Sequence, residues 1–222
     1  MSPRSAGFQP AFSPLVTDSV ATSAVNIRRR KRLPHWEASG RIYFVTFRLV
    51  DSLPASLLRR IVSKRRQALE KAPASCRPDS LSERKRLKRL FSRRIEAYLD
   101  AGKGCCSLAH PAVAEIVAEA IRHFDGLRYE LFAWCIMPNH VHVVFRPLKE
   151  NSLAAILHSW KSFTAQSANR ILGRTGIFWQ REYYDHLVRN GEQFARAIRY
   201  IAQNPGRAGL KNWKWMWISQ AD

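Results

Sequence analysis

The sequence predicts an α+β fold with a ferredoxin-like central antiparallel sheet and helices packed on it. Segments with the two-residue period of strands alternate with segments that have the period of helices. Two of the strand-like segments, residues 127–136 and 140–146, are separated only by Met137-Pro-Asn139, which predicts an antiparallel hairpin. Hydrophobic residues make up 46% of the 222 residues, which is enough for the core of one domain.

The first half of the chain predicts one strand and two helices. Residues 41–49 follow Gly40 and are rich in β-branched and aromatic side chains, as strands are. A helix is expected to begin at Ser52-Leu-Pro54 and to run to about residue 72. Leucines at helical spacing in residues 81–99 predict a very basic helix, which belongs to an insertion over about residues 73–110.

The second half adds the hairpin, three helices and an extended segment. Pro111 begins an amphipathic helix that ends near residue 124. Residues 151–171 form a helix that Asn151 and Ser152 cap. Residues 178–188 are expected to be extended, and residues 191–204 form the last helix, which stops at Pro205.

Net charge points to the class of partner. The chain has 37 Lys and Arg residues against 17 Asp and Glu residues, a formal net charge of +20. Such a balance favours binding to a polyanion, with nucleic acid ahead of an anionic membrane. No apolar run approaches the roughly 20 residues that span a bilayer. The four cysteines form no CxxC pair, which favours reduced thiols in a cytoplasmic protein.

His140 and His142 are the first candidates for a site. Side chains two residues apart on a strand leave the same face, so both imidazoles can converge on one metal ion. The spacing alone favours two histidines that merely fill a polar edge. The tight turn before the pair and the apolar residues around it raise the odds of a metal site, because buried polar groups need partners.

Tyr200 and Asn204 are the second candidates. They stand four residues apart on the last predicted helix and therefore share one edge of it. Alone, they fit an amphipathic helix with a border tyrosine and a terminal asparagine. Combined with the histidines, they supply a third metal ligand and a nucleophile. A cation favours the ionised phenol and offsets phosphate charge, so this set suits covalent phosphotyrosine chemistry.

These motifs resemble those of the tyrosine HUH transposases of the IS200/IS605 type, and most of all the REP-associated branch. The segment Pro-Asn-His-Val-His ending at His142 resembles the histidine signature of that family. The segment Tyr-Ile-Ala-Gln-Asn-Pro, residues 200–205, followed by Ala-Gly-Leu at 208–210, resembles its tyrosine block. The similarity covers about residues 33–213. It leaves residues 1–32 as a flexible basic tail and residues 214–222 as a Trp-rich tail.

The resemblance implies roles for these residues. It makes Tyr200 the nucleophile, His140 and His142 metal ligands, and Asn204 the third ligand. It also implies a metal-dependent transposase that cleaves and transfers single-stranded DNA at hairpin-flanked sites through a 5′-phosphotyrosine, leaving a free 3′-hydroxyl. The implied cofactor is Mg²⁺ or Mn²⁺, although imidazole ligands alone favour a softer metal such as zinc. The expected protein is nucleoid-associated and either a monomer or a homodimer.

Other nucleophiles and other functions also fit the sequence. Tyr183 and Tyr184 are rival nucleophiles. A non-catalytic or domesticated nucleic-acid-binding protein of the same fold is the main alternative function, and a metal-dependent hydrolase using the histidine pair is a further one. Basic side chains expected to guide the DNA strand are Lys161, Arg181, Arg189, Arg196 and Arg199.

Overall fold

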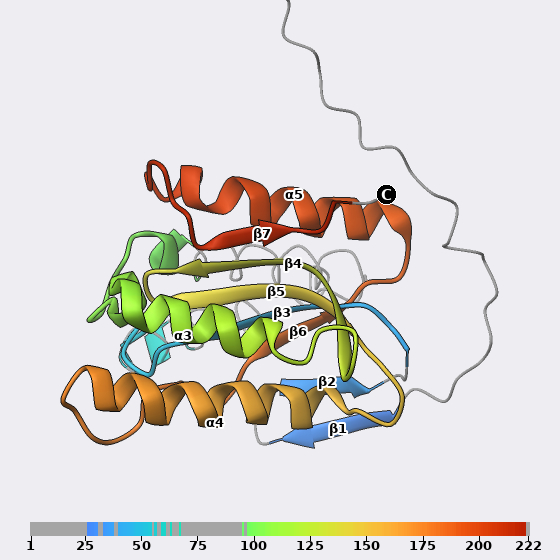
Figure 1. Cartoon of the computed structure of the whole chain (residues 1–222), viewed down its shortest axis with the longest axis horizontal. Helices are drawn as coiled ribbons and strands as arrows, with labels where there is room; N and C mark the ends of the chain where they lie inside the picture. Colours follow the sequence, from blue (N-terminus) through green and yellow to red (C-terminus); the bar gives the residue numbers. More distant parts are fainter. Residues whose placement is uncertain are drawn as a thin grey trace, which may run out of the picture.

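The central element is a five-stranded sheet whose neighbouring strands all run antiparallel (Figure 1). A computed structural model describes residues 40–54 and 97–220, the backbone of two short strands before them, and single residues between 56 and 95. The strand order in the sheet is β6-β3-β5-β4-β7. The strands are β3 (Tyr43–Arg48), β4 (Tyr129–Met137), β5 (His140–Pro147), β6 (Tyr184–Leu187) and β7 (Met216–Ile218).

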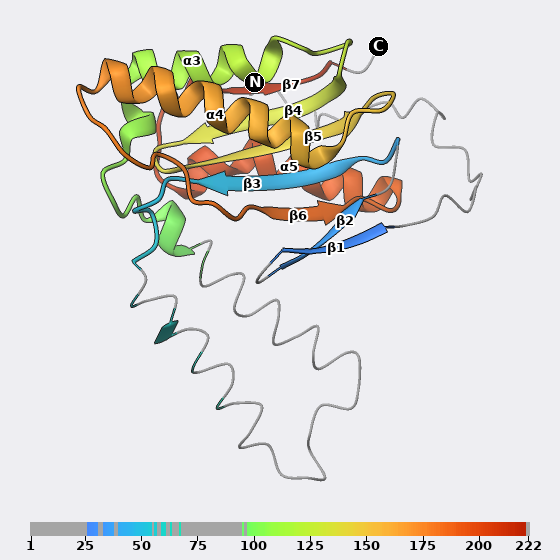
Figure 2. The same cartoon turned by 90° about the horizontal axis from the view of Figure 1, so that it is seen from below.

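Helices cover both faces of this sheet. The helices α3 (Pro111–Arg122) and α4 (Leu153–Ile171) lie together on one face, and α5 (Gly191–Arg207) lies on the other (Figures 1 and 2). The predicted α+β fold, with an antiparallel sheet and helices packed on it, is confirmed. A separate antiparallel ladder joins β1 (Asn26–Arg30) to β2 (Leu33–Glu37), and η2 (Ser107–Ala109) is a single 3₁₀ turn.

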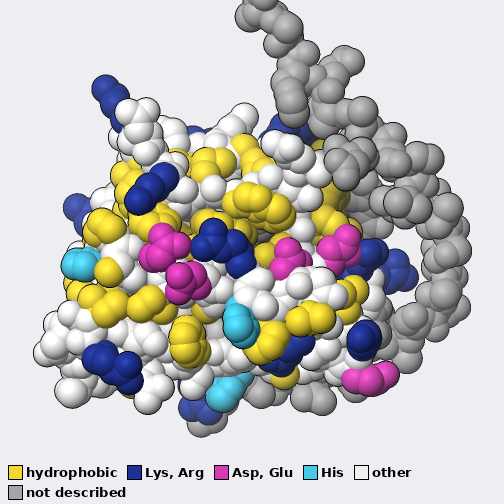
Figure 3. Space-filling model, in the orientation of Figure 1, with side chains coloured by type: hydrophobic (Ala, Val, Ile, Leu, Met, Phe, Trp, Pro, Cys, Tyr) yellow, Lys and Arg dark blue, Asp and Glu magenta, His cyan; other side chains and the backbone are white. Residues whose placement is uncertain are grey.

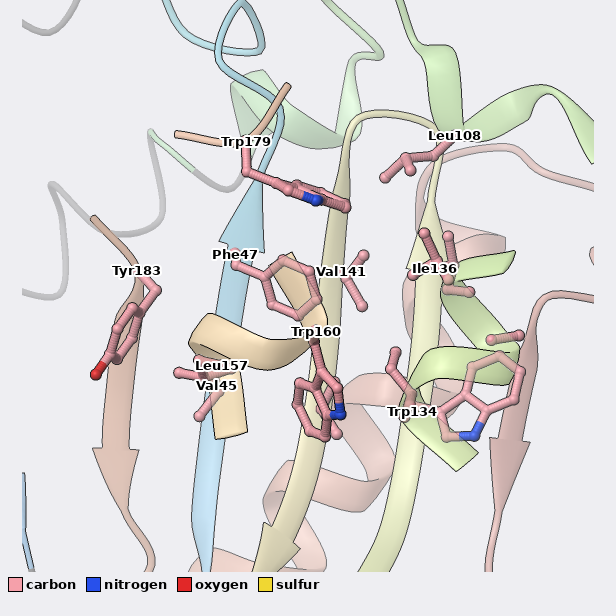
Figure 4. Packing of buried hydrophobic residues seen from close by; sticks show 14 of the residues in the cluster. Val45, Phe47, Leu108, Trp134, Ile136, Val141, Leu157, Trp160, Trp179 and Tyr183 are labelled. Carbon is pink, nitrogen blue, oxygen red and sulfur yellow. The ribbon is translucent and has the colours of Figure 1, made fainter. Parts of the chain in front are cut away.

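The larger core lies between the sheet and the helices α3 and α4. Alternate residues of β3 face it, and Phe47 packs its ring against Trp160 of α4 and Trp179 (Figure 4). The indole of Trp160 donates a hydrogen bond of 3.0 Å to the hydroxyl of Tyr129, which in turn donates to the carbonyl of Ile121 at 2.8 Å. These polar ends are satisfied inside the core, as buried aromatic residues require.

The smaller core lies between the sheet and α5. It consists of the buried side chains of Ala133, Cys135, Met137 and Val144 from the hairpin and of Ile201 from α5. Because side chains alternate along a strand, the positions of β3 and β5 that do not face α4 face this helix. The candidate site belongs to this second face.

The last helix and the extended segment before it differ from the sequence prediction. The helix α5 does not stop at Pro205 but ends at Arg207. Pro205 lies in the last turn, where a proline removes only its own N–H donor. The helical hydrogen bonding continues past it, because Ala208 N donates to Asn204 O at 3.1 Å. Within the predicted extended segment, only Tyr184–Leu187 pairs as a strand, beside an isolated bridge between Leu49 and Trp179.

The Trp-rich end of the chain contributes an edge strand. Met216–Ile218 forms β7, in which Trp217 stands opposite Trp134 of β4. Most of the predicted helix over 52–72 and of the basic helix over 81–99 lies outside the described residues, as does most of the predicted tail over 1–32. Among the helices that the structure describes, none has the length and apolar character of a membrane span.

Candidate functional site

The predicted convergence of His140 and His142 is present on β5. Both side chains are almost fully buried on the face of the sheet that α5 covers. Their Nε2 atoms lie 2.9 Å apart. In the ladder with β3, Arg48 stands opposite His140 and Thr46 stands opposite His142.

Each imidazole is oriented through its other ring nitrogen. Nδ1 of His140 lies 2.7 Å from Oδ1 of Asn139, and Nδ1 of His142 lies 2.8 Å from the hydroxyl of Thr46. An amide oxygen only accepts, so Nδ1 of His140 carries the proton and its Nε2 presents a lone pair. If Thr46 accepts in the same way, two lone pairs meet at 2.9 Å, and a cation between them removes their repulsion.

Both histidines are held in the neutral form that a metal ligand requires. Burial lowers the pKa of His140 to about 3, with a further contribution from the positive charge of Arg48. Burial also lowers the pKa of His142 well below its usual value, and His140 adds to this effect. Neutral imidazoles at physiological pH need lose no proton before they bind a metal ion.

The turn before the pair is tied to two other segments. Nδ2 of Asn139 donates to the carbonyl of Lys103 at 2.8 Å, and the Asn139 carbonyl accepts from Leu49 N at 2.9 Å. The neighbouring carbonyl of Pro138 accepts from Leu108 N at 3.1 Å. Asn139 therefore links the orientation of His140 to the end of β3 and to the chain before α3.

The helix α5 brings Tyr200 and Asn204 to the same point. Nδ2 of Asn204 lies 3.3 Å from Nε2 of His142, and the Tyr200 ring meets the His142 ring edge-on at a centroid distance of 5.1 Å. Oδ1 of Asn204 is buried and accepts no hydrogen bond from any residue that the structure describes. Turning the amide by half a rotation directs this oxygen at His142, so the residues fit a metal ion bound by two imidazoles and an amide oxygen.

Asp100 is a neighbour of the site that the sequence did not reveal. Its Oδ1 lies 3.9 Å from Nε2 of His140, and burial raises the pKa of its carboxyl group, opposed by Arg207. Over residues 40–54 and 97–220, no three His, Cys, Asp or Glu side chains form a metal-binding group. The Asn204 amide, 3.3 Å from Nε2 of His142, and the Asp100 carboxyl, 3.9 Å from Nε2 of His140, are the two candidates for a third ligand.

The rival tyrosines occupy different places. Tyr183 is 9% exposed and belongs to the larger core, away from the histidines (Figure 4). Tyr184 is 40% exposed and stands opposite Thr46 in the ladder between β3 and β6, so it shares the sheet face with His142. The Tyr200 ring contacts the ring of the site histidine His142.

The basic residues predicted to contact DNA do not form one group. Nζ of Lys161 donates to the carbonyls of Gln180 and Arg181 at 2.7 and 2.9 Å, and burial lowers its pKa to about 8. Arg196 is exposed and paired with Glu192. On the face drawn in Figure 3, basic, acidic and apolar side chains are interspersed. The remaining predicted contacts are all exposed: Arg181, Arg189 and Arg199.

Comparison with known proteins agrees with the resemblance noted in the sequence. Residues 108–204 match the family model described as Transposase IS200 like. A putative REP-associated tyrosine transposase of Haemophilus influenzae is 30% identical over 99 residues, which cover 38% of this chain and 56% of that protein. A REP-associated tyrosine transposase of Escherichia coli is 25% identical over 93 residues, which cover 41% of this chain and 49% of that protein. The chain thus spans about half the length of these curated relatives.

Two solved structures match this chain at low similarity. One is a REP-associated tyrosine transposase bound to a REP hairpin, with 14% identity and a TM-score of 0.45, covering 82% of this chain and 76% of that one. The other is a putative transposase from Deinococcus radiodurans, with 10% identity and a TM-score of 0.30, covering 80% of this chain and 98% of that one.

Proposed function

We propose that the chain cleaves and transfers DNA strands through Tyr200, because residues 108–204 match the family model of IS200-like transposases. One observation carries this proposal. Tyr200 and Asn204, from α5, reach the two histidines of β5 within a single chain, although about sixty residues separate the two pairs. The residues proposed as nucleophile and metal ligands, with a polar group behind each imidazole, therefore lie close together within one chain.

The residues divide the chemistry between them. His140, His142 and Asn204 hold a divalent ion, Mg²⁺ or Mn²⁺, which supplies positive charge against the attacked phosphate. Tyr200 releases its phenolic proton and forms a bond from its oxygen to phosphorus, while the bond from phosphorus to the 3′ oxygen breaks. The 3′ oxygen takes up a proton, and the 5′ phosphate stays on the tyrosine. One ester replaces another, so a later strand can reverse the step.

The proposed substrate is single-stranded DNA with a hairpin beside the cleavage site. The net charge of +20 supports a nucleic acid partner, because basic proteins gain affinity by displacing counterions from phosphates. The two curated relatives are named for an association with REP elements, which supports a hairpin of that kind. Binding is then expected to weaken steeply as salt rises.

A covalent-adduct assay tests the proposal. The protein is incubated with end-labelled single-stranded hairpin DNA and Mn²⁺ or Mg²⁺, and the products are separated on a denaturing gel. We expect an adduct that requires the metal and disappears in Tyr200→Phe, while Tyr200→Phe still binds the DNA. Tyr184→Phe is the matched control, because this tyrosine lies on the same sheet face.

The other outcomes separate the alternatives. Binding without any adduct would identify a non-catalytic binder of the same fold. An adduct that survives Tyr200→Phe but is lost in Tyr184→Phe would transfer the role of nucleophile to Tyr184. No binding to single-stranded or hairpin DNA would refute the proposal.

A further inference from the structure

Arg48 is a basic residue at the site to which no role has been given. It ends β3 directly opposite His140 in the antiparallel ladder between β3 and β5. Opposite residues in such a ladder lie on one face of the sheet, with Cβ atoms roughly 4.5–5.5 Å apart. The Arg48 side chain therefore leaves the sheet on the face that carries both histidines, and its charge contributes to the lowered pKa of His140.

One end of this guanidinium is buried without a partner, although the residue as a whole is only partly buried. Nη1 of Arg48 is inaccessible to solvent and donates no hydrogen bond to any described residue. Within residues 40–54 and 97–220, no carboxylate forms an ion pair with Arg48. Burial lowers its pKa only to about 10, so the side chain is still a cation at neutral pH. Partial burial of a cation without a counter-charge costs free energy, and an anion that enters the site relieves this cost.

Arg146 provides the contrast within the same sheet. It lies on β5, an even number of residues from the histidines and hence on the same face. Unlike Arg48, it is ion-paired with Glu130 and lies over the ring of Phe132. One arginine of this face therefore has a carboxylate partner, whereas no described carboxylate forms an ion pair with the other.

We propose that Arg48 binds the phosphodiester that Tyr200 attacks, through guanidinium N–H groups that donate to a non-bridging phosphate oxygen. This inference rests on the proposed function and adds the group that recognises the charge of the reacting phosphate. A planar guanidinium matches two phosphate oxygens better than an ammonium does. Negative charge on these oxygens increases as phosphorus becomes five-coordinate, so the contact strengthens during the reaction.

A binding experiment isolates this contact from catalysis. The probes are the dinucleotide dTpdT and the same dinucleotide with an uncharged methylphosphonate linkage, titrated calorimetrically with EDTA present. The wild-type protein is expected to prefer the charged probe by roughly tenfold or more, as for a charge-assisted contact. Arg48→Met is expected to lose this preference, Arg48→Lys to keep part of it, and Arg146→Met to keep all of it.

A stability measurement distinguishes phosphate binding by Arg48 from a purely structural role. Arg48→Met removes a partly buried cation that has no ion-pair partner among the described residues, so its urea midpoint is expected to equal or exceed that of the wild type. Arg146→Met breaks a pair and is expected to lower the midpoint. A clear loss of stability in Arg48→Met, together with an unchanged preference in Arg48→Lys for the charged probe, would make the arginine a packing residue and overturn the inference.

The outcomes for the two proposals are distinguishable. If Tyr200→Phe leaves the adduct unchanged but Arg48→Met abolishes the preference for the charged probe, the nucleophile assignment fails and the phosphate site stands. If the adduct depends on Tyr200 but wild type and Arg48→Met both bind the two probes alike, the phosphate contact is refuted. With both proposals correct, Arg48→Met slows adduct formation by roughly 100-fold or more, and Mn²⁺ binding is unchanged.

Discussion

Acidification should destabilise the metal-free protein because His140 and His142 are buried in the neutral form. Burial lowers the pKa of His140 to about 3 and that of His142 well below its usual value. In the unfolded chain both titrate near ~6.5. Below that pH the unfolded state takes up protons that the folded state does not, so stability is greatest above pH ~6.5 and falls with pH. For His140 the loss continues until the pH nears its folded pKa of about 3.

The size of the effect follows from the unfolded-state pKa as long as the folded-state values lie below the working pH. Each histidine then costs about 1.4 kcal/mol for every pH unit below ~6.5. At about pH 5 the cost is about 2 kcal/mol for His140, and protonation of His142 acts in the same direction. A domain is typically stable by roughly 5–15 kcal/mol, so this loss is large. The raised pKa of Asp100 acts in the opposite direction, since the folded state holds that proton more tightly.

Urea unfolding in EDTA at about pH 7.5 and about pH 5 measures the effect. The double variant His140→Asn/His142→Asn should lose most of the pH dependence, whereas His158→Asn, on the exposed surface of α4, should keep it. Mn²⁺ should stabilise the wild type at the higher pH. It should also make stability depend more steeply on pH, because protons compete with the metal for the imidazoles. A wild-type stability that stays level or rises on acidification would refute the reasoning.

Three further substitutions test the support of the site and of the core. Asn139→Ala removes the acceptor that orients His140, so calorimetry should show Mn²⁺ binding weakened roughly 10- to 100-fold. Unchanged Mn²⁺ binding would contradict that role of Asn139. Tyr129→Phe removes the hydroxyl that accepts from the buried indole of Trp160, and urea unfolding should show that stability falls by about 1–3 kcal/mol. An unchanged stability would contradict a role for this hydrogen bond. Gly104 has a φ of +95°, and a Cβ added there would lie 3.0 Å from the carbonyl oxygen of Asp51. Gly104→Ala should therefore lower the stability by about 1–3 kcal/mol, whereas a melting temperature equal to that of the wild type would show that the loop adapts.

Local patterns were sufficient to predict most of the framework. The hairpin of β4 and β5 follows from two apolar runs around a short turn, and Ser152 caps α4 by accepting from Ala155 N as expected. The side of the sheet on which α5 packs was not predictable, because an amphipathic pattern shows that one side of a helix is buried but not against which face. The edge strand β7 has only three paired residues, too few to show alternation.

The site was predictable to the extent that strand and helix periods determine it. The two-residue period places His140 beside His142, and the four-residue spacing places Tyr200 beside Asn204. The same alternation extended along residues 44, 46 and 48 of β3 is a signal that would have placed Arg48 on the histidine face. No local signal identifies Asp100, because its approach to His140 depends on how distant segments pack.

The two-residue turn between β4 and β5 determines which side chains can reach the site at all. Met137 pairs with His140 across it, so the two strands keep their alternation in step through residues 138 and 139. One inserted or deleted residue would put the rest of β5 out of phase with β4, presenting Val141 and Val143 to α5 and sending both imidazoles into the apolar layer beneath α4. In this turn the site depends on the number of residues as well as on the side chain of Asn139. Frame-preserving deletions of a single codon should therefore be more damaging here than most substitutions nearby.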